Sequence, residues 1–206
     1  MSSVAAGSHP AHKDYEGSKL GMWLFLFTEI LLFGGLFLLY SAYRAKYPLD
    51  FHVAGQHLNM VIGVVNTVIL LTSSLTVAVA ITAIQKGNRK LTMLCLTATI
   101  AFGIVFLVNK YFEWSAEIRR GIYPNGPELL KLPDGEKIFY GLYYSMTGLH
   151  GLHVVAGIIL LSIVLDLVRR QRVSSTDFNK LENAGLYWHL VDVIWIFLLP
   201  LLYLAA

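Results

Sequence analysis

Five long apolar stretches constrain the fold of this 206-residue chain more than any other feature. They cover about residues 20–43, 60–84, 91–115, 138–168 and 186–204. Each is long enough to cross a bilayer as a helix, which takes about 20 apolar residues. Soluble domains carry about 25% charged residues, whereas this chain carries 14%, with 56% hydrophobic residues. The sequence therefore predicts an all-α integral membrane bundle of five transmembrane helices.

The first 18 residues lack the apolar core of a signal peptide, so we expect a flexible tail ahead of a single domain over residues 19–206. His9 and His12 in this tail are candidate metal ligands, but an isolated pair on a flexible segment favours no site. The single cysteine, Cys95, excludes an internal disulfide and Cys-ligated metal clusters within the chain. The small net charge of +3 lies in loops and predicts no nucleic-acid partner.

Basic residues indicate the orientation in the membrane. The short loops QKGNRK (85–90) and RRQR (169–172) fall on the same side as the N-terminus. Short loops rich in Lys and Arg stay in the cytoplasm. We therefore expect the N-terminus in the cytoplasm and the C-terminus outside. On the outer side, YPNGPELLKLPDG (123–135) predicts turns with a short surface helix, either as a solvated connection or as a lid.

Ionisable side chains inside apolar spans are the candidate site residues, because each costs about 2.5–3.5 kcal/mol to insert. Glu29 and Glu113 are the candidate buried acids. Burial disfavours a charged carboxylate, so we expect Glu29 to be neutral. It is then either a proton-handling group or an acid hydrogen-bonded to another helix.

Two histidines, His150 and His153, lie in TGLHGLHVVAG near the middle of the fourth span. Haem or metal ligation is one interpretation, and a bis-histidine haem would then need His189 on the fifth span. The other is that the glycines admit a neighbouring helix to which the histidines hydrogen-bond. Because no Glu-x-x-His pair of the di-iron type occurs, we favour packing and predict no metal site.

The segment YWHLVDVIWIFLLP (187–200) combines His189 and Asp192, three residues apart, with Trp188 and Trp195, seven apart. Each pair shares one helical face, so His189 and Asp192 can couple as an imidazole–carboxylate pair, although packing is the favoured interpretation of this segment. The tryptophans are either interfacial anchors, with Trp188 near the helix start, or core residues. Asn66 and nearby Ser and Thr residues are predicted to hydrogen-bond between helices.

Five motifs occur in the order and spacing seen in subunit III of haem–copper oxygen reductases: GMWLFLFTEILLFGGLF, VNTVILLTSSLTV, KYFEW, TGLHGLHVVAG and YWHLVDVIWIFL. The chain resembles this family over about residues 17–204. The resemblance implies a helical bundle without redox cofactors or catalytic residues, beside subunits I and II that hold the haem and copper. It also implies bound phospholipid, support of proton uptake into subunit I, and oxygen access.

Carried over by motif, Glu29 matches the family's buried acid, and Glu113 matches the acid of its Glu-Tyr-like motif, here Glu113-Trp114. His150, His153, His189 and Asp192 match polar positions of the last two helices. Longer members have two further helices before the first one here. The short form resembles that of bacterial oxidases, in which these helices can be fused to subunit I, so we expect a bacterial inner-membrane protein.

The resemblance favours an accessory subunit of a proton-pumping cytochrome c oxidase that reduces oxygen to water. Alternatives within the family are subunit III of a quinol oxidase and an accessory subunit of a nitric oxide reductase. Outside it, the histidines would suit a di-haem membrane anchor, and Glu29 with Asp192 would suit a secondary transporter. Transporters of that kind show internal repeats and broken helices, and neither pattern is visible.

Overall fold

The computed structural model describes residues 15–204, which fold into helices joined by short loops. The elements are α1 (Tyr15–Lys46), α2 (Pro48–Gln56), α3 (Met60–Gln85), α4 (Arg89–Arg119), the 3₁₀ turn Leu129–Lys131, α5 (Asp134–Arg169) and α6 (Asn179–Leu199), followed by one π-helical turn, Pro200–Leu204. Among the described residues, five helices are long and apolar enough to cross a membrane. The predicted five-span fold class is confirmed, and the chain is a multi-pass membrane protein.

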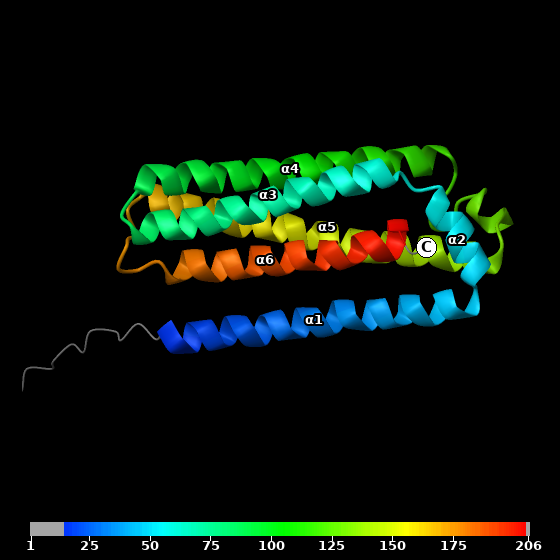
Figure 1. Ribbon diagram of the computed structural model, residues 1–206, viewed down its shortest axis with the longest axis horizontal. Coiled ribbons are helices and arrows are strands. Elements are labelled where there is room, and N and C mark those ends of the chain that lie inside the picture. Colours follow the sequence, from blue (N-terminus) through cyan, green and yellow to red (C-terminus); the bar gives the residue numbers. More distant parts are fainter. Residues whose placement is uncertain (1–14, 205–206) are drawn as a thin grey trace, which may run out of the picture.

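Helices α3 to α6 form a ring in which each packs against its neighbours in the chain and α3 closes against α6. Figure 1 shows α1 running along one side of this ring, where it packs on α5 and α6. The short helix α2 turns back across one end and packs on α5. We call this end, which holds α2 and Leu204, the C-terminal end, and the opposite one, with the start of α1, the N-terminal end.

Polar caps start two of the spans. The Asn59 side chain accepts hydrogen bonds from the first free N–H groups of α3, and Asn88 does the same for α4. Gly87, at φ +74°, takes the left-handed conformation that turns the chain between them. Arg89 then donates its Nε hydrogen to the carbonyl oxygen of Val168 at 2.8 Å, placing a cation at the C-terminus of α5. The Asn88 cap, Gly87 and Arg89 fix the N-terminal end of the ring, whereas the Asn59 cap lies at the C-terminal end, beside α2.

Helix α1 contacts the ring through one narrow stripe. Its buried apolar residues, Leu26, Phe33 and Tyr40, are seven residues apart, and most of its other apolar side chains are exposed. A seven-residue repeat keeps one helix face toward a partner. One face of α1 therefore packs on the ring, and most apolar side chains of the rest of the helix are exposed.

The helices extend beyond the predicted spans. Helix α1 begins at Tyr15, so residues 15–18 are helical and not part of a flexible tail. The rest of the predicted tail, with His9 and His12, lies outside the described residues. Helix α6 begins at Asn179, ahead of the predicted residue 186, and α2 was not predicted at all. Leu129–Lys131 is the short helical turn expected in the outer loop.

Candidate functional site

The most concentrated polar site is a buried cluster of Lys110 and Glu113 on α4, Tyr143 on α5 and Tyr203 in the π-helical turn. Lys110 Nζ donates to Glu113 Oε1 at 3.0 Å, to the Tyr143 hydroxyl at 3.2 Å and to the Tyr203 hydroxyl at 3.1 Å. Both tyrosine hydroxyls donate in turn to Glu113 Oε1, that of Tyr143 at 2.6 Å. The cluster therefore joins three segments that are far apart in the sequence.

The hydrogen-bond pattern of this cluster favours one charge state for its lysine and glutamate. An ammonium has three hydrogens to donate and a carboxylate only accepts. All three hydrogens of Lys110 have acceptors, and each tyrosine accepts one bond from Lys110 while donating one to Glu113. This closed pattern suits a protonated Lys110 beside an ionised Glu113. The pair is neutral as a whole, which lowers the cost of its burial.

The π-helical turn brings Tyr203 into the cluster. Pro200 has no backbone N–H to continue the α-helical ladder, and the turn from Pro200 to Leu204 is wider. The hydroxyl of Tyr40 on α1 donates to the carbonyl oxygen of Leu201 in this turn at 2.6 Å. The turn is thus held by α1 on one side and by the cluster on the other.

Toward the middle of the bundle, aromatic rings cover the cluster. Lys110 Nζ lies 5.4 Å from the ring centroid of Trp195, within the range of a cation–π contact. The imidazole of His150, fully buried, packs against the rings of Phe106 and Trp195, with centroid distances of 5.4 and 5.1 Å. Beside them, Asn109 on α4 donates to Asn66 on α3 at 2.8 Å. His150 is thus packed among rings, and Asn66 joins two helices.

A second ionisable site joins α1 to the ring. His153 Nε2 lies 2.8 Å from Glu29 Oε2, and its Nδ1 lies 2.8 Å from the carbonyl oxygen of Leu149. A carbonyl only accepts, so Nδ1 carries a hydrogen. One further proton is then shared between Nε2 and the Glu29 carboxyl. Either a neutral acid donates to a neutral imidazole, or an imidazolium donates to a carboxylate, and the pair has no net charge in both cases.

His189 and Asp192 do not hydrogen-bond to each other. His189 Nδ1 lies 2.6 Å from the Ser74 hydroxyl on α3. Asp192 is buried, and neither of its carboxyl oxygens has a hydrogen-bonding partner among the described residues. Residues three apart on a helix share a face, but this face meets α3, where Ser74 lies near both side chains.

Trp188 fills the centre of the ring and is not an interfacial anchor. Its side chain is fully buried, and its Nε1 donates to the Ser73 hydroxyl on α3 at 2.9 Å. Gly103 on α4 and Gly157 on α5 make room for the indole: a Cβ at these positions would lie 2.8 and 2.7 Å from its atoms. Because α6 begins at Asn179, Trp188 is well inside the helix.

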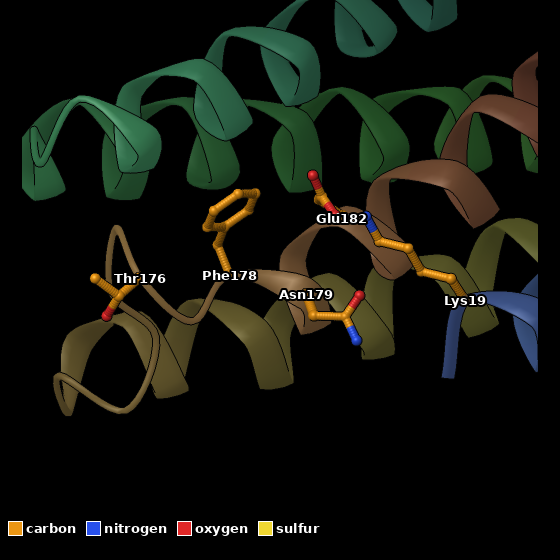
Figure 2. A pocket seen from close by; sticks show the side chains of 5 residues that line it. All are labelled: Lys19, Thr176, Phe178, Asn179 and Glu182. Carbon is orange, nitrogen blue, oxygen red and sulfur yellow. Dashed lines mark ion pairs between the residues drawn. The ribbon is translucent and has the colours of Figure 1, made fainter. Parts of the chain in front are cut away.

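At the N-terminal end, a pocket of about 190 Å³ lies beside an exposed ion pair. Figure 2 shows Lys19 of α1 extending toward Glu182 of α6, and the two charged groups lie 2.8 Å apart. Thr176, Phe178 and Asn179 line the rest of this pocket. The pair ties α1 to α6, and with a half-exposed lysine it contributes little to stability.

Among residues 15–204, no three His, Cys, Asp or Glu side chains are grouped so that they could hold a metal ion. The three intramembrane histidines have separate surroundings: rings for His150, Glu29 for His153 and Ser74 for His189. Sequence reasoning named Glu29, Glu113 and these histidines but missed Lys110, Tyr143 and Tyr203. The three-residue spacing of Lys110 and Glu113 in an apolar span was a signal that could have found the first.

The fold and these sites define a helical membrane bundle held by internal polar contacts, and comparison with known proteins gives its family. Residues 1–206 match the family Cytochrome c oxidase subunit III. A relative named Cytochrome c oxidase subunit 3, from Alkalihalophilus pseudofirmus, is 30% identical over 97% of this chain and 93% of its own length. The chain belongs to the cytochrome c oxidase subunit III family.

Two further relatives differ in their names. One from Staphylococcus saprophyticus, named Probable quinol oxidase subunit 3, is 30% identical over 97% of each chain. One from Aeropyrum pernix is named Heme-copper oxidase subunit I+III. It is 30% identical over 91% of this chain, which covers 22% of the relative's length.

Proposed function

We propose that this chain is the accessory, non-catalytic subunit III of a proton-pumping terminal oxidase, and that it docks directly against subunit I with subunit II in the same complex. The match to the family over the whole chain carries this proposal. The relative named subunit I+III supports the choice of subunit I as the partner. The separate surroundings of the three histidines support a role without haem or copper on this chain.

Exposed apolar surface is available for docking and for lipid. Helix α1 exposes large side chains along most of its length, among them Leu24, Phe27 and Leu31. An apolar groove of about 280 Å³ runs between α1 and α6, lined by Phe33, Phe37 and Phe197 among others. A phospholipid chain or a partner helix would fill such a surface in the bilayer. Bound phospholipid and a path for oxygen are both part of this proposal.

The proposed role in proton uptake centres on Glu29 and His153. Their shared proton lies at the junction of α1 and α5, where both side chains are only partly covered. A carboxyl–imidazole pair at the flank of the bundle can accept and release protons beside a partner. The other polar positions, Glu113, Asn66, His150, Trp188, His189 and Asp192, hold the ring in the shape that presents this flank.

Orientation follows from the loops. The α3–α4 and α5–α6 loops lie at the N-terminal end, with Lys86 in the first loop and Arg89 and Lys90 at the start of α4. We therefore place that end in the cytoplasm and the C-terminal end outside the bacterial inner membrane. The electron donor is cytochrome c in this proposal; a relative named quinol oxidase subunit 3 supports a quinol donor as the alternative.

Depletion of the chain from the purified oxidase tests the proposal. Oxygen consumption is followed over time at two pH values, with the complex rebuilt from the wild-type chain as control. We expect the haem spectrum and the initial turnover to be largely kept, proton uptake to slow at high pH, and inactivation to come within fewer turnovers. Immediate loss of haem or of all activity would contradict a non-redox role. Unchanged kinetics and lifetime would reduce the chain to an assembly factor.

A further inference from the structure

The C-terminal end of the bundle carries a polar cavity of about 410 Å³ between α2, α5 and the end of α4. Gln56, His57, Arg120 and Glu136 line it, and Tyr140 is the innermost of its polar residues. Tyr140 is fully buried, and within residues 15–204 its hydroxyl has no hydrogen-bonding partner. A buried hydroxyl at the floor of a polar cavity indicates a ligand that hydrogen-bonds to it.

From Tyr140, polar atoms continue inward between α4 and α5. Glu117 lies within electrostatic reach of Tyr140 and of Glu113, which is one turn further along α4. Glu117 Oε1 accepts from Arg120 at 3.0 Å, and Glu113 Oε1 belongs to the lysine cluster. The second oxygen of each carboxylate, Oε2, is buried and receives no hydrogen bond from the described part of the chain. Three unpartnered buried oxygens thus follow one another from the cavity to the cluster.

These three groups cannot satisfy one another. Carboxylate oxygens only accept, and the one tyrosine hydroxyl has a single hydrogen to donate. Water supplies the missing donors, since a buried water needs two to four polar partners and donates two hydrogens. The cavity has room for several water molecules, given that one needs about 10–15 Å³.

We propose that this cavity is the mouth of a hydrated inlet that brings water from the C-terminal end of the bundle past Tyr140 and Glu117 to Glu113. The inlet ends at the Lys110 cluster, because the rings of Phe106, His150 and Trp195 fill the space beyond it. The hydroxyl protons of Tyr143 and Tyr203 then exchange with solvent at one end of the bundle only. This inference does not depend on the proposed function.

Hydroxyl-radical footprinting of the intact complex tests the inlet, because radicals formed from bound water label the side chains next to it even when these are buried. We expect Tyr140 and Tyr143 to be labelled several-fold faster than Tyr187. Tyr187 is the matched control, since it is buried and its hydroxyl donates to a protein partner, the carbonyl oxygen of His153. Labelling of Tyr143 no faster than that of Tyr187 would overturn the proposal.

A substitution at Glu117 tests whether water reaches the lysine cluster by way of this residue. Glu117→Leu removes the carboxylate that lies between the cavity and the lysine cluster. The side chain of its partner Arg120 is more than half exposed, so it stays hydrated without Glu117. We expect labelling of Tyr143 and Tyr203 to fall several-fold while that of Tyr140 is kept. The exposed change Glu128→Gln should leave all three unchanged. If Tyr143 and Tyr203 keep their labelling in Glu117→Leu, water reaches them by another route and the inlet is wrong.

Discussion

The two halves of the helical ring are built on different principles. Toward the N-terminal end the core is mostly aliphatic, with fully buried residues such as Val77, Leu96 and Leu161, and its buried polar groups are uncharged hydroxyls such as those of Thr92 and Thr99. Toward the C-terminal end the same four helices bury an ion pair, two tyrosine hydroxyls, an asparagine pair and a histidine. Along the bundle, from its N-terminal to its C-terminal end, the main contacts between helices thus change from apolar packing to hydrogen bonds.

The difference shows how a membrane bundle fixes its geometry. Lipid chains are as apolar as an aliphatic core, so apolar packing alone gives modest preference for one helix arrangement. Hydrogen bonds have direction, and a slip of one helix would leave buried donors and acceptors unpaired at a cost of about 1–3 kcal/mol each. The polar half therefore sets the register of the helices, and the apolar half fills the space that this register leaves.

The largest effect is expected from Lys110→Met. The change leaves an ionised Glu113 in the core with two tyrosine donors and no cation, and breaking a buried pair in this way costs about 3–5 kcal/mol. Leu96→Met is the matched change in the apolar half of the same helix. As a swap of similar volume it should cost less than about 1.5 kcal/mol. Unfolding free energies in detergent measure both.

The double variant Lys110→Met with Glu113→Gln sharpens this prediction. Removing the charge of both partners should recover part of the loss, since no uncompensated carboxylate remains. A double variant no more stable than Lys110→Met would show that packing around Lys110, and not its charge, carries the effect.

A smaller loss of stability is expected from changes next to Trp188, whose indole lies between the two halves of the ring. In Gly157→Ala the new methyl would lie 2.7 Å from the indole, and overpacking of this kind costs about 1–3 kcal/mol. Gly151→Ala on the same helix is the control, because a Cβ there meets nothing within 4 Å. Thermal unfolding should separate the two variants; equal midpoints would mean that the indole can move aside.

The Glu29–His153 pair should respond more weakly still to Glu29→Gln. If Glu29 is neutral, as predicted from the sequence, the amide of glutamine can donate to His153 Nε2 in place of the acid, and the loss should stay below about 1 kcal/mol. Infrared spectra of the wild type should then show a protonated carboxyl band near neutral pH that disappears in the variant. Absence of such a band would favour the imidazolium–carboxylate form.

The smallest effect is expected at the surface. Lys131 and Glu128 form an ion pair at 2.7 Å in the loop at the C-terminal end, and both side chains are more than half exposed. Exposed pairs are worth about 0–1 kcal/mol. Glu128→Gln should therefore leave the unfolding free energy within experimental error. A loss comparable to that of Gly157→Ala would mean that this loop takes part in the polar half.

The sequence predicted the five spans because the length of an apolar run is a local property. It also singled out Glu29 and His153, since a charge-capable group in such a run is unusual. It could not pair them: they lie 124 residues apart, and their contact depends on how α1 docks on α5. His189 bonds to Ser74 and not to Asp192, because helical spacing says which residues share a face but not which neighbour that face meets.

Tyr143 and Tyr203 could not have been found from the sequence. The chain has 11 tyrosines, and a tyrosine in an apolar span is unremarkable by itself. Only the π-helical turn after Pro200 brings the Tyr203 hydroxyl onto Glu113. Helix α2 was missed because nine residues between two spans read as a loop, although Pro48 at its first turn is a common start for a helix.

The residues of the lysine cluster are synthesised at different times, so the cluster can be completed only at the end of translation. Lys110 and Glu113 leave the ribosome together on α4, but Tyr143 follows one helix later and Tyr203 only after α6. Until then the ion pair enters the membrane with its tyrosine partners still to come. The polar half is therefore the last part to mature. A chain that ends before α6 would leave the Lys110–Glu113 pair in the bilayer without the Tyr203 hydroxyl. Membrane quality control could recognise this incompletely hydrogen-bonded ion pair and so distinguish the truncated chain from the finished subunit.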